Sequence, residues 1–211
     1  MSFDIECLSE KGFPKADKDR VITIGIVCKT CFKPGNTRKI VFQLDSCELI
    51  NGADVFQFEE ERFLLEAFDN FVHCYDPDFI TGYNIIEFDL KYLINRYSNL
   101  LGGNVHWSRY KHIPTQVIQS KYQSKLMGFR SRSLINLEGR IQFDMMIYMI
   151  KNAKLRSYSL NYVSYHFLNQ SKEDVNHYTM RKLQKGTARN RKRIATYCLK
   201  DAVLPLNLFE N

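Results

Sequence analysis

Apolar and acidic residues alternate at the start of the chain. Phe3, Ile5 and Cys7 are apolar, and Asp4 and Glu6 stand between them. Because side chains on a strand point to opposite faces in turn, this pattern predicts a strand with one buried face and one carboxylate face. Both carboxylates then leave the same face of the strand.

Two β-branched runs follow, over residues 21–28 and 38–44, on either side of Pro34-Gly35-Asn36. Short β-branched runs separated by turn residues are typical of a hairpin. The chain is therefore expected to open with an antiparallel meander that includes the acidic strand.

The spacing of apolar residues becomes helical over residues 59–74, where acids gather in the first turn. A short apolar run over residues 79–83 predicts a buried strand, and a second helical pattern ends at Gly102-Gly103. Strands and helices in this order indicate a mixed α/β sheet with crossover helices.

The pattern weakens after this point, and residues 103–120 are interpreted as an irregular segment. Two apolar runs, 133–137 and 140–143, then flank Glu138-Gly139, which supplies the glycine that a tight turn favours. This arrangement predicts a second hairpin over residues 133–143.

Four helices are expected in the rest of the chain. One opens at Asp144, a second covers about 157–168, and a capping pattern over residues 171–174 predicts the start of a third. The last begins near Ala188 and is expected to end where Pro205 removes a backbone donor.

The chain has 211 residues, of which 45% are hydrophobic and 25% are charged, so it suits one domain with a substantial core. The apolar run from Met145 to Ile150 is too short to span a bilayer, and the first residues lack the pattern of a secretory signal. These features predict a protein inside a cell, with no membrane partner.

Charge is divided unevenly along the sequence. Residues 1–100 carry 11 Lys/Arg and 17 Asp/Glu, a net charge of −6, whereas residues 101–211 carry 19 and 6, a net charge of +13. An acidic half suits metal binding, and a basic half suits a polyanion held through its phosphates. Solvated helix faces would give the same asymmetry, so charge alone does not choose between these interpretations.

Three acidic patches are candidates for chemistry. The first is Asp4 with Glu6, whose carboxylates repel each other unless a cation lies between them. An exposed polar edge would give the same strand pattern.

Tyr197 and Asp201 are i and i+4 on the predicted last helix, hence on one face. Since a phenol with a pKa of about 10 is protonated at neutral pH, Tyr197 is expected to orient a water and not to act as a base.

Asp89 follows a buried strand, a usual position for ligands in open α/β sheets, although the helix dipole would also favour an acid there. Asn84 carries donors and an acceptor suited to a nucleotide, and Phe88 can stack on a base, a contact worth roughly 1–3 kcal/mol. Taken singly, Asn84 also fits a helix cap, Phe88 the core and Asp144 a cap. Four carboxylates with one tyrosine form a set that can hold two divalent cations over a phosphodiester.

These patches resemble the exonuclease motifs of the family B DNA polymerases. Residues 3–6, Phe-Asp-Ile-Glu, are similar to the first motif, residues 82–89 to the second, and residues 197–201 to the third. Longer strings over residues 154–161, 166–168 and 172–175 resemble the delta branch of eukaryotic replicative polymerases. The resemblance covers nearly the whole chain.

The resemblance implies a ribonuclease H-like fold of the DEDDy exonuclease type over residues 1–211: a mixed α/β sheet flanked by helices, with an inserted β-hairpin placed at residues 133–143. It implies hydrolysis of mispaired 3′-terminal nucleotides to 5′-monophosphates with two Mg²⁺ or Mn²⁺ ions. The residues that it assigns are the metal carboxylates Asp4, Glu6, Asp89 and Asp201, the water-positioning Tyr197, and the primer contacts Asn84 and Phe88.

The chain departs from that family in two ways. Glu87 stands where the delta branch usually has Asn, which is expected to add negative charge beside the site. Palm, fingers and thumb are absent from residues 1–211, so an excised domain is expected. The implied partners are the single-stranded 3′ end of primer DNA, the remaining polymerase domains and accessory subunits, in the nucleus.

Two other hypotheses compete with a proofreading exonuclease. A related exoribonuclease would use the same acids, but the delta-like strings argue against it. A catalytically silent nucleic-acid-binding scaffold would have lost its carboxylates, whereas all four and the tyrosine are present in this sequence.

Overall fold

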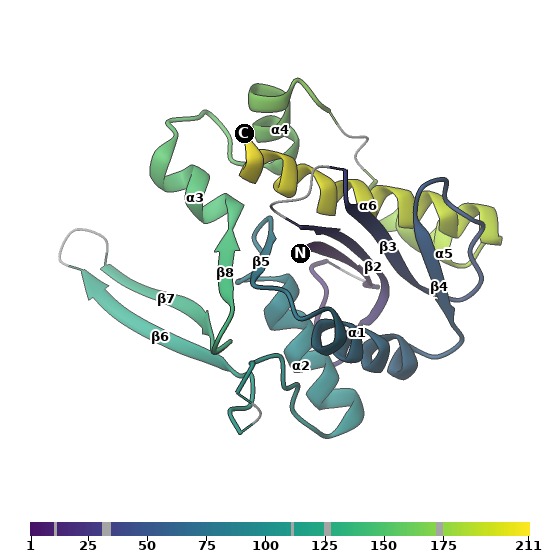
Figure 1. The fold of residues 1–211 in the computed structure, drawn as a ribbon, viewed down its shortest axis with the longest axis horizontal. Helices are drawn as coiled ribbons and strands as arrows, with labels where there is room; N and C mark the ends of the chain where they lie inside the picture. Colours follow the sequence, from purple (N-terminus) through teal and green to yellow (C-terminus); the bar gives the residue numbers. More distant parts are fainter. Residues whose placement is uncertain (11, 31–34, 111, 125–127, 172–174) are drawn as a thin grey trace.

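A mixed sheet forms the centre of the molecule (Figure 1). The computed structural model describes residues 1–10, 12–30, 35–110, 112–124, 128–171 and 175–211. Within these residues the sheet has six strands in the order β4-β3-β2-β1-β5-β8. They are β1 (Ser2–Leu8), β2 (Arg20–Lys29), β3 (Thr37–Leu44), β4 (Asp54–Phe58), β5 (Phe79–Gly82) and β8 (Ile141–Asp144).

The first three strands confirm the predicted antiparallel meander, in which β2 pairs with both β1 and β3. The other pairs, β3–β4, β1–β5 and β5–β8, are parallel. Strand β4 at the edge was not predicted. Most of its side chains are exposed or half-buried, so it lacks the clear alternation that marks a strand with one buried face.

Helices cover both faces of the sheet. Figure 1 shows α1 and α2 below the sheet and α6 above it. No helix among the described residues is long and apolar enough to cross a membrane. The helices of the described residues are α1 (Glu61–Tyr75), α2 (Asp89–Leu101), α3 (Met145–Asn152), α4 (Leu160–Leu168), α5 (His177–Gln184) and α6 (Ala188–Glu210).

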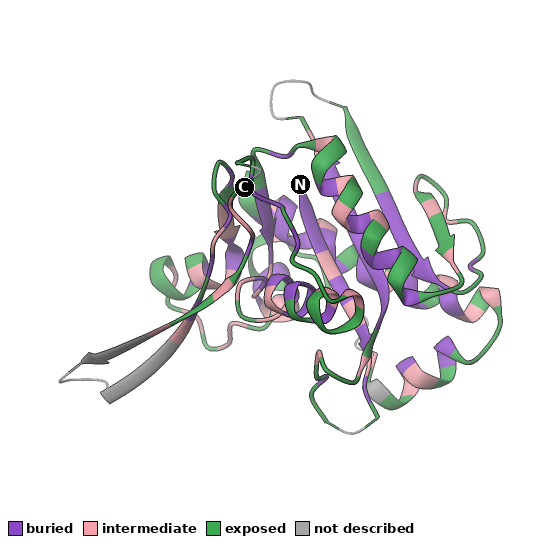
Figure 2. Cartoon of the chain, turned by 90° about the horizontal axis from the view of Figure 1, so that it is seen from below, coloured by how far each residue is buried: buried purple, intermediate pink, exposed green. Residues whose placement is uncertain are grey.

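The alternation on β1 places its residues as predicted. Phe3, Ile5 and Cys7 belong to the main core with α1 and α2, which is seen as the buried interior in Figure 2. Asp4 and Glu6 consequently leave the opposite face, toward α6.

A buried ion pair joins α1 and α2 to the sheet. The Glu61 carboxylate accepts two hydrogen bonds from Arg96, at 2.8 and 2.7 Å, and one from the backbone N–H of Val21 at 2.7 Å. A buried carboxylate with this many donors is well compensated for its loss of water. The pair therefore fixes both helices against the start of β2.

Helix α6 lies directly on β2 because the sheet has a glycine there. A Cβ atom at Gly25 would lie 2.8 Å from the backbone N of Leu199 and 2.9 Å from the carbonyl O of Cys198. Gly25 is also the register partner of Asp4 on β1. The missing side chain thus lets the helix approach the strand pair at the acidic face.

The predicted second hairpin over residues 133–143 is wrong. Strand β7 (Gly128–Ile135) pairs with β6 (Val117–Ser124), and β8 instead pairs in parallel with β5. The expected irregular segment thus contains a strand. Polar residues alternate weakly in β6, and the local pattern does not show that β8 completes the open edge of β5.

One helix boundary differs from expectation, and a second prediction lies largely outside the described residues. Helix α6 continues through Pro205 to Glu210, because its last turns are held by buried Leu206 and Leu208 although the proline removes one helical hydrogen bond. The predicted start over residues 171–174 includes residues 172–174, outside the described part. The described α5 begins at His177, where the Asn176 side chain caps it.

Replacing Gly25 with alanine is expected to lower the free energy of unfolding by about 1–3 kcal/mol, because the methyl group would press on the backbone of α6. Urea unfolding of the purified chain measures this. Gly103→Ala is the matched control, since a Cβ there would meet nothing nearer than Tyr97 Cε1 at 4.0 Å. Equal stabilities of the two variants would contradict the predicted close contact.

Candidate active site

Three of the four predicted carboxylates converge. One oxygen from each of Asp4, Glu6 and Asp201 lies within 4.8 Å of the other two. Asp4 and Glu6 come from β1, and Asp201 from α6. Asp4 and Glu6 are half-buried and Asp201 is only 6% exposed, so little water screens the repulsion between them.

Two hydrogen bonds hold α6 to β1 around this cluster. The Cys198 thiol donates to the carbonyl O of Asp4 at 3.2 Å, and the Ser2 hydroxyl donates to the carbonyl O of Ala202 at 2.6 Å. Burial raises the pKa of Cys198 well above its usual value, so the thiol keeps its proton and remains a donor. The spacing between strand and helix is thus set by backbone contacts beside the acids.

Asp89 lies next to the cluster but is not one of the three converging acids. It is 1% exposed, and its Oδ1 accepts from the backbone N–H of Ile5, which stands between Asp4 and Glu6, at 3.0 Å. Burial raises the pKa of Asp89 to about 7. Backbone donors oppose that rise, and the charges of Asp144 and Asp201 add to it. Its role as a metal ligand stays a prediction.

Asp144 connects the second motif to another part of the fold. It caps α3, as expected, by accepting from the backbone N–H of Met146. It also accepts from the backbone N–H groups of Asn84 and Ile86, at 3.0 and 3.1 Å, which ties down the turn over residues 83–88. The sequence pattern predicted the cap. It could not predict the bonds of Asp144 to the turn, because those partners lie about 60 positions away in the sequence.

Asn84 and Phe88 lie on that turn. Asn84 has a φ of 62°, in the left-handed region that Asn tolerates better than most residues. The Phe88 ring is half-buried, with its centroid 5.1 Å from that of Phe13 and 5.6 Å from that of Tyr92. The turn is therefore rigidly supported, and the nucleotide contacts of both residues stay predictions.

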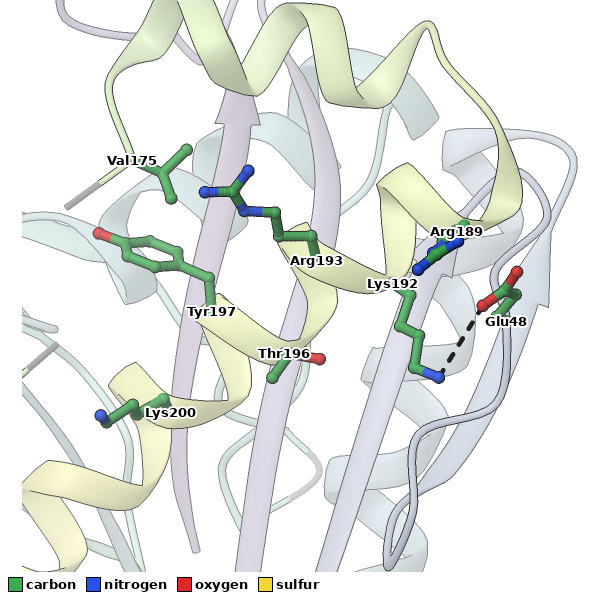
Figure 3. Close-up of a pocket in the computed structure, with 8 residues that line it drawn as sticks. All are labelled: Glu48, Val175, Arg189, Lys192, Arg193, Thr196, Tyr197 and Lys200. Atoms are coloured by element: carbon green, nitrogen blue, oxygen red, sulfur yellow. Dashed lines mark ion pairs between the residues drawn. The ribbon is translucent and has the colours of Figure 1, made fainter. Parts of the chain in front are cut away.

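Tyr197 borders a cavity of 730 Å³ that is lined mainly by residues of α6. Figure 3 shows its ring pointing to the same side as the Arg193 guanidinium. Four cationic side chains and one acid line the space, so its surroundings favour an anionic ligand. The lining residues are Glu48, Val175, Arg189, Lys192, Arg193, Thr196, Tyr197 and Lys200.

The acid cluster suits a hard divalent cation. Its three converging side chains offer only carboxylate oxygens, the donors that Mg²⁺, Mn²⁺ and Ca²⁺ prefer. Crowded carboxylates are also better tolerated once a cation neutralises them. The residues therefore fit a divalent metal.

A profile described as "DNA polymerase family B, exonuclease domain" matches residues 1–163. The chain belongs to this family, as the three motifs predicted. It is 45% identical over 214 residues to the DNA polymerase delta catalytic subunit of Plasmodium falciparum. It is 43% and 42% identical over 212 residues to the proteins of that name from Drosophila melanogaster and Bos taurus.

These alignments cover 100% of the chain but only 19–20% of each relative. The chain thus spans about a fifth of the length of the curated relatives that it matches. The resemblance to the delta branch is confirmed over the full chain.

In the metal-free protein, Asp89 is expected to make stability fall as pH rises from about 4 to about 7. A carboxyl with a raised pKa keeps its proton in the folded chain at a pH where the unfolded chain has lost it. The contribution of Asp89 to folding stability is complete below the pKa of the unfolded chain, and it is lost as the pH rises through the pKa of the folded chain.

Asp89→Asn can still accept the bond from Ile5, so it should flatten this part of the profile. Thermal unfolding in EDTA at each pH measures the slope, with the exposed Asp54→Asn as the control. An unchanged slope in Asp89→Asn would assign the dependence to another group.

Proposed function

We propose that this chain is a metal-dependent 3′→5′ exodeoxyribonuclease, the proofreading domain of a larger replicative DNA polymerase. The observation that carries the proposal is the convergence of Asp4, Glu6 and Asp201 within 4.8 Å, in a chain of the family B exonuclease-domain family. The names of its relatives, DNA polymerase delta catalytic subunits, support DNA as the substrate.

The carboxylates divide the task of holding the metals. Asp4, Glu6 and Asp201 would hold the cations, and Asp89 would supply a fourth carboxylate when it loses its proton. Two bound divalent cations would supply Lewis acidity for an in-line displacement at phosphorus and would lower the pKa of the attacking water. The close packing of α6 keeps these acids in place without movement of the backbone.

The neighbouring residues orient the substrate. Tyr197, one helical turn before Asp201, positions the attacking water through its phenol. The turn over residues 83–88 presents Asn84 and Phe88 to the terminal nucleotide. The cationic cavity beside Tyr197 attracts the phosphates of the strand and offsets the negative charge of the acids.

The proposal extends to partners and location. Its substrate is the single-stranded 3′ end of a primer, and its products are nucleoside 5′-monophosphates. Because the chain spans about a fifth of its relatives' length, the other polymerase regions and accessory subunits are its proposed partners, in the nucleus.

A 5′-labelled single-stranded DNA oligonucleotide is expected to shorten stepwise from its 3′ end with Mg²⁺ or Mn²⁺, and EDTA should stop the reaction. Asp4→Ala with Glu6→Ala should reduce cleavage to background and remain folded, because it removes the metal ligands and relieves repulsion. The control Glu60→Ala removes an exposed acid and should cleave normally. Full activity in the double variant would disprove the site, and faster turnover of RNA would make the chain an exoribonuclease.

Tyr197→Phe is expected to lower kcat by about tenfold, less than the roughly 10²–10⁴-fold of a lost general base, because only an orienting hydroxyl is removed. Single-turnover cleavage measures it, with Tyr165→Phe as an exposed tyrosine control. A loss as complete as that of the double variant would mean that Tyr197 is indispensable for the chemistry itself.

A further inference from the structure

The hairpin of β6 and β7 stands apart from the main sheet. It forms its own two-stranded sheet and projects from the body of the molecule (Figure 1). A two-stranded hairpin is marginally stable alone, so its direction depends on what holds its base. The residues that join it to the rest of the chain are therefore of interest.

The carboxylate of Glu87 binds the base of this hairpin. Ser133 of β7 is 1% exposed, and its backbone N–H donates to Glu87 Oε1 at 2.7 Å. Its hydroxyl donates to Glu87 Oε2 at 2.8 Å. Glu87 was expected to add negative charge beside the site, and the structure shows in addition that the hairpin binds its carboxylate.

Further donors complete this contact, which we name the Glu87 clamp (Glu87, Lys91, Gln119 and Ser133). Lys91 Nζ and Gln119 Nε2 each donate to the Ser133 hydroxyl at 3.1 Å. Lys91 Nζ also lies 3.8 Å from the Glu87 carboxylate. With its hydroxyl fully used and its amide buried, Ser133 would be left unsatisfied if the carboxylate were removed.

The two faces of the hairpin base differ. Ser133 and Gln119 are cross-strand partners on the face that meets the clamp. The next pair, Ile118 and Leu134, points the other way and is 50% and 48% exposed. The hairpin base therefore meets the body of the molecule through the Gln119–Ser133 pair and, on the same face, through Val117 and Ile135, which pack in the main core.

Glu87 is also connected to the acids of β1 through the hydrogen bonds of its neighbours in the sequence. The preceding residue, Ile86, donates its N–H to Asp144, and two residues later Asp89 accepts from Ile5 of β1. One short turn therefore bonds to the acidic strand, the start of α3 and the hairpin. Movement of the hairpin base relative to β1 would require some of these bonds to break.

We propose that Glu87 is the positioning residue that holds the hairpin and the turn over residues 83–88 as one rigid wall beside a single nucleic-acid strand. This inference rests on the proposed nuclease function. Glu87 acts through Ser133 and touches neither the metals nor the reacting phosphate. Its loss should impair long substrates, which run along the wall, and spare a substrate that fills only the metal site.

Glu87→Ala tests this in the 211-residue chain, with Glu60→Ala as a control of equal charge change at an exposed site. Amide hydrogen exchange over residues 128–135 should accelerate in Glu87→Ala alone. kcat/KM for a single-stranded DNA oligonucleotide should fall by about tenfold, since small displacements of bound substrate cost up to about 10²-fold. Turnover of the p-nitrophenyl ester of thymidine 5′-monophosphate should be unchanged, because Asp144 still holds the backbone of the turn that carries Asn84 and Phe88.

Glu87→Gln separates geometry from charge. Its carboxamide oxygen can still accept from the Ser133 N–H, but its NH₂ cannot replace the acceptor of the Ser133 hydroxyl, which already accepts from Lys91 and Gln119. It should therefore restore part of the exchange protection and part of the DNA turnover that Glu87→Ala loses. Ser133→Ala combined with Glu87→Ala should cost less than the sum of the two single changes, because both remove the bond between the hydroxyl and the carboxylate.

Unchanged exchange in Glu87→Ala would disprove the clamp. Faster exchange with an unchanged ratio of DNA to ester turnover would show that the clamp is purely structural and overturn the positioning role. A wild-type chain that cleaves neither substrate would instead disprove the proposed nuclease. The Kd of a fluorescent oligonucleotide in Ca²⁺ would then test whether Glu87 positions the strand. An unchanged Kd in Glu87→Ala would count against that role.

Discussion

The candidate active site depends on the close seating of α6 against β2 at Gly25. Gly25 pairs with Asp4, and the helix backbone over it comes within the distance that a methyl group would occupy. Only this approach allows Asp201, on the helix, to reach the two acids of β1. The thiol of Cys198 then bonds to the Asp4 carbonyl from the same helix, so one packing contact places both halves of the site.

This arrangement has a cost that the rest of the fold must offset. Three crowded carboxylates and a buried Asp89 repel one another without a cation. Apolar burial on both faces of the sheet and the Glu61–Arg96 pair hold the elements together despite that repulsion. A cation bound among these acids would relieve the repulsion and would thereby stabilise the fold.

Local patterns were sufficient for part of this architecture. Periodicity located β1, the meander and the first two helices, because each has one buried face, and it placed Asp4 and Glu6 on a common face. It located the strand β8 but not its pairing, because the partner β5 is parallel and distant in sequence. It failed for Pro205, where tertiary packing overrides helix propensity. The contacts of Asp144 and Glu87 with their distant partners have no periodic signal at all.

The structure shows where the acidic and the basic parts of the sequence meet. Helix α6 carries Asp201 at the acid cluster and, within the preceding turns, the cationic residues Arg189, Lys192 and Arg193 that line the cavity beside Tyr197. A site of clustered acids alone would repel a polyanion. Cations on the same helix favour anions close to the acids. The helix that completes the acid cluster therefore also carries the cations of the neighbouring cavity.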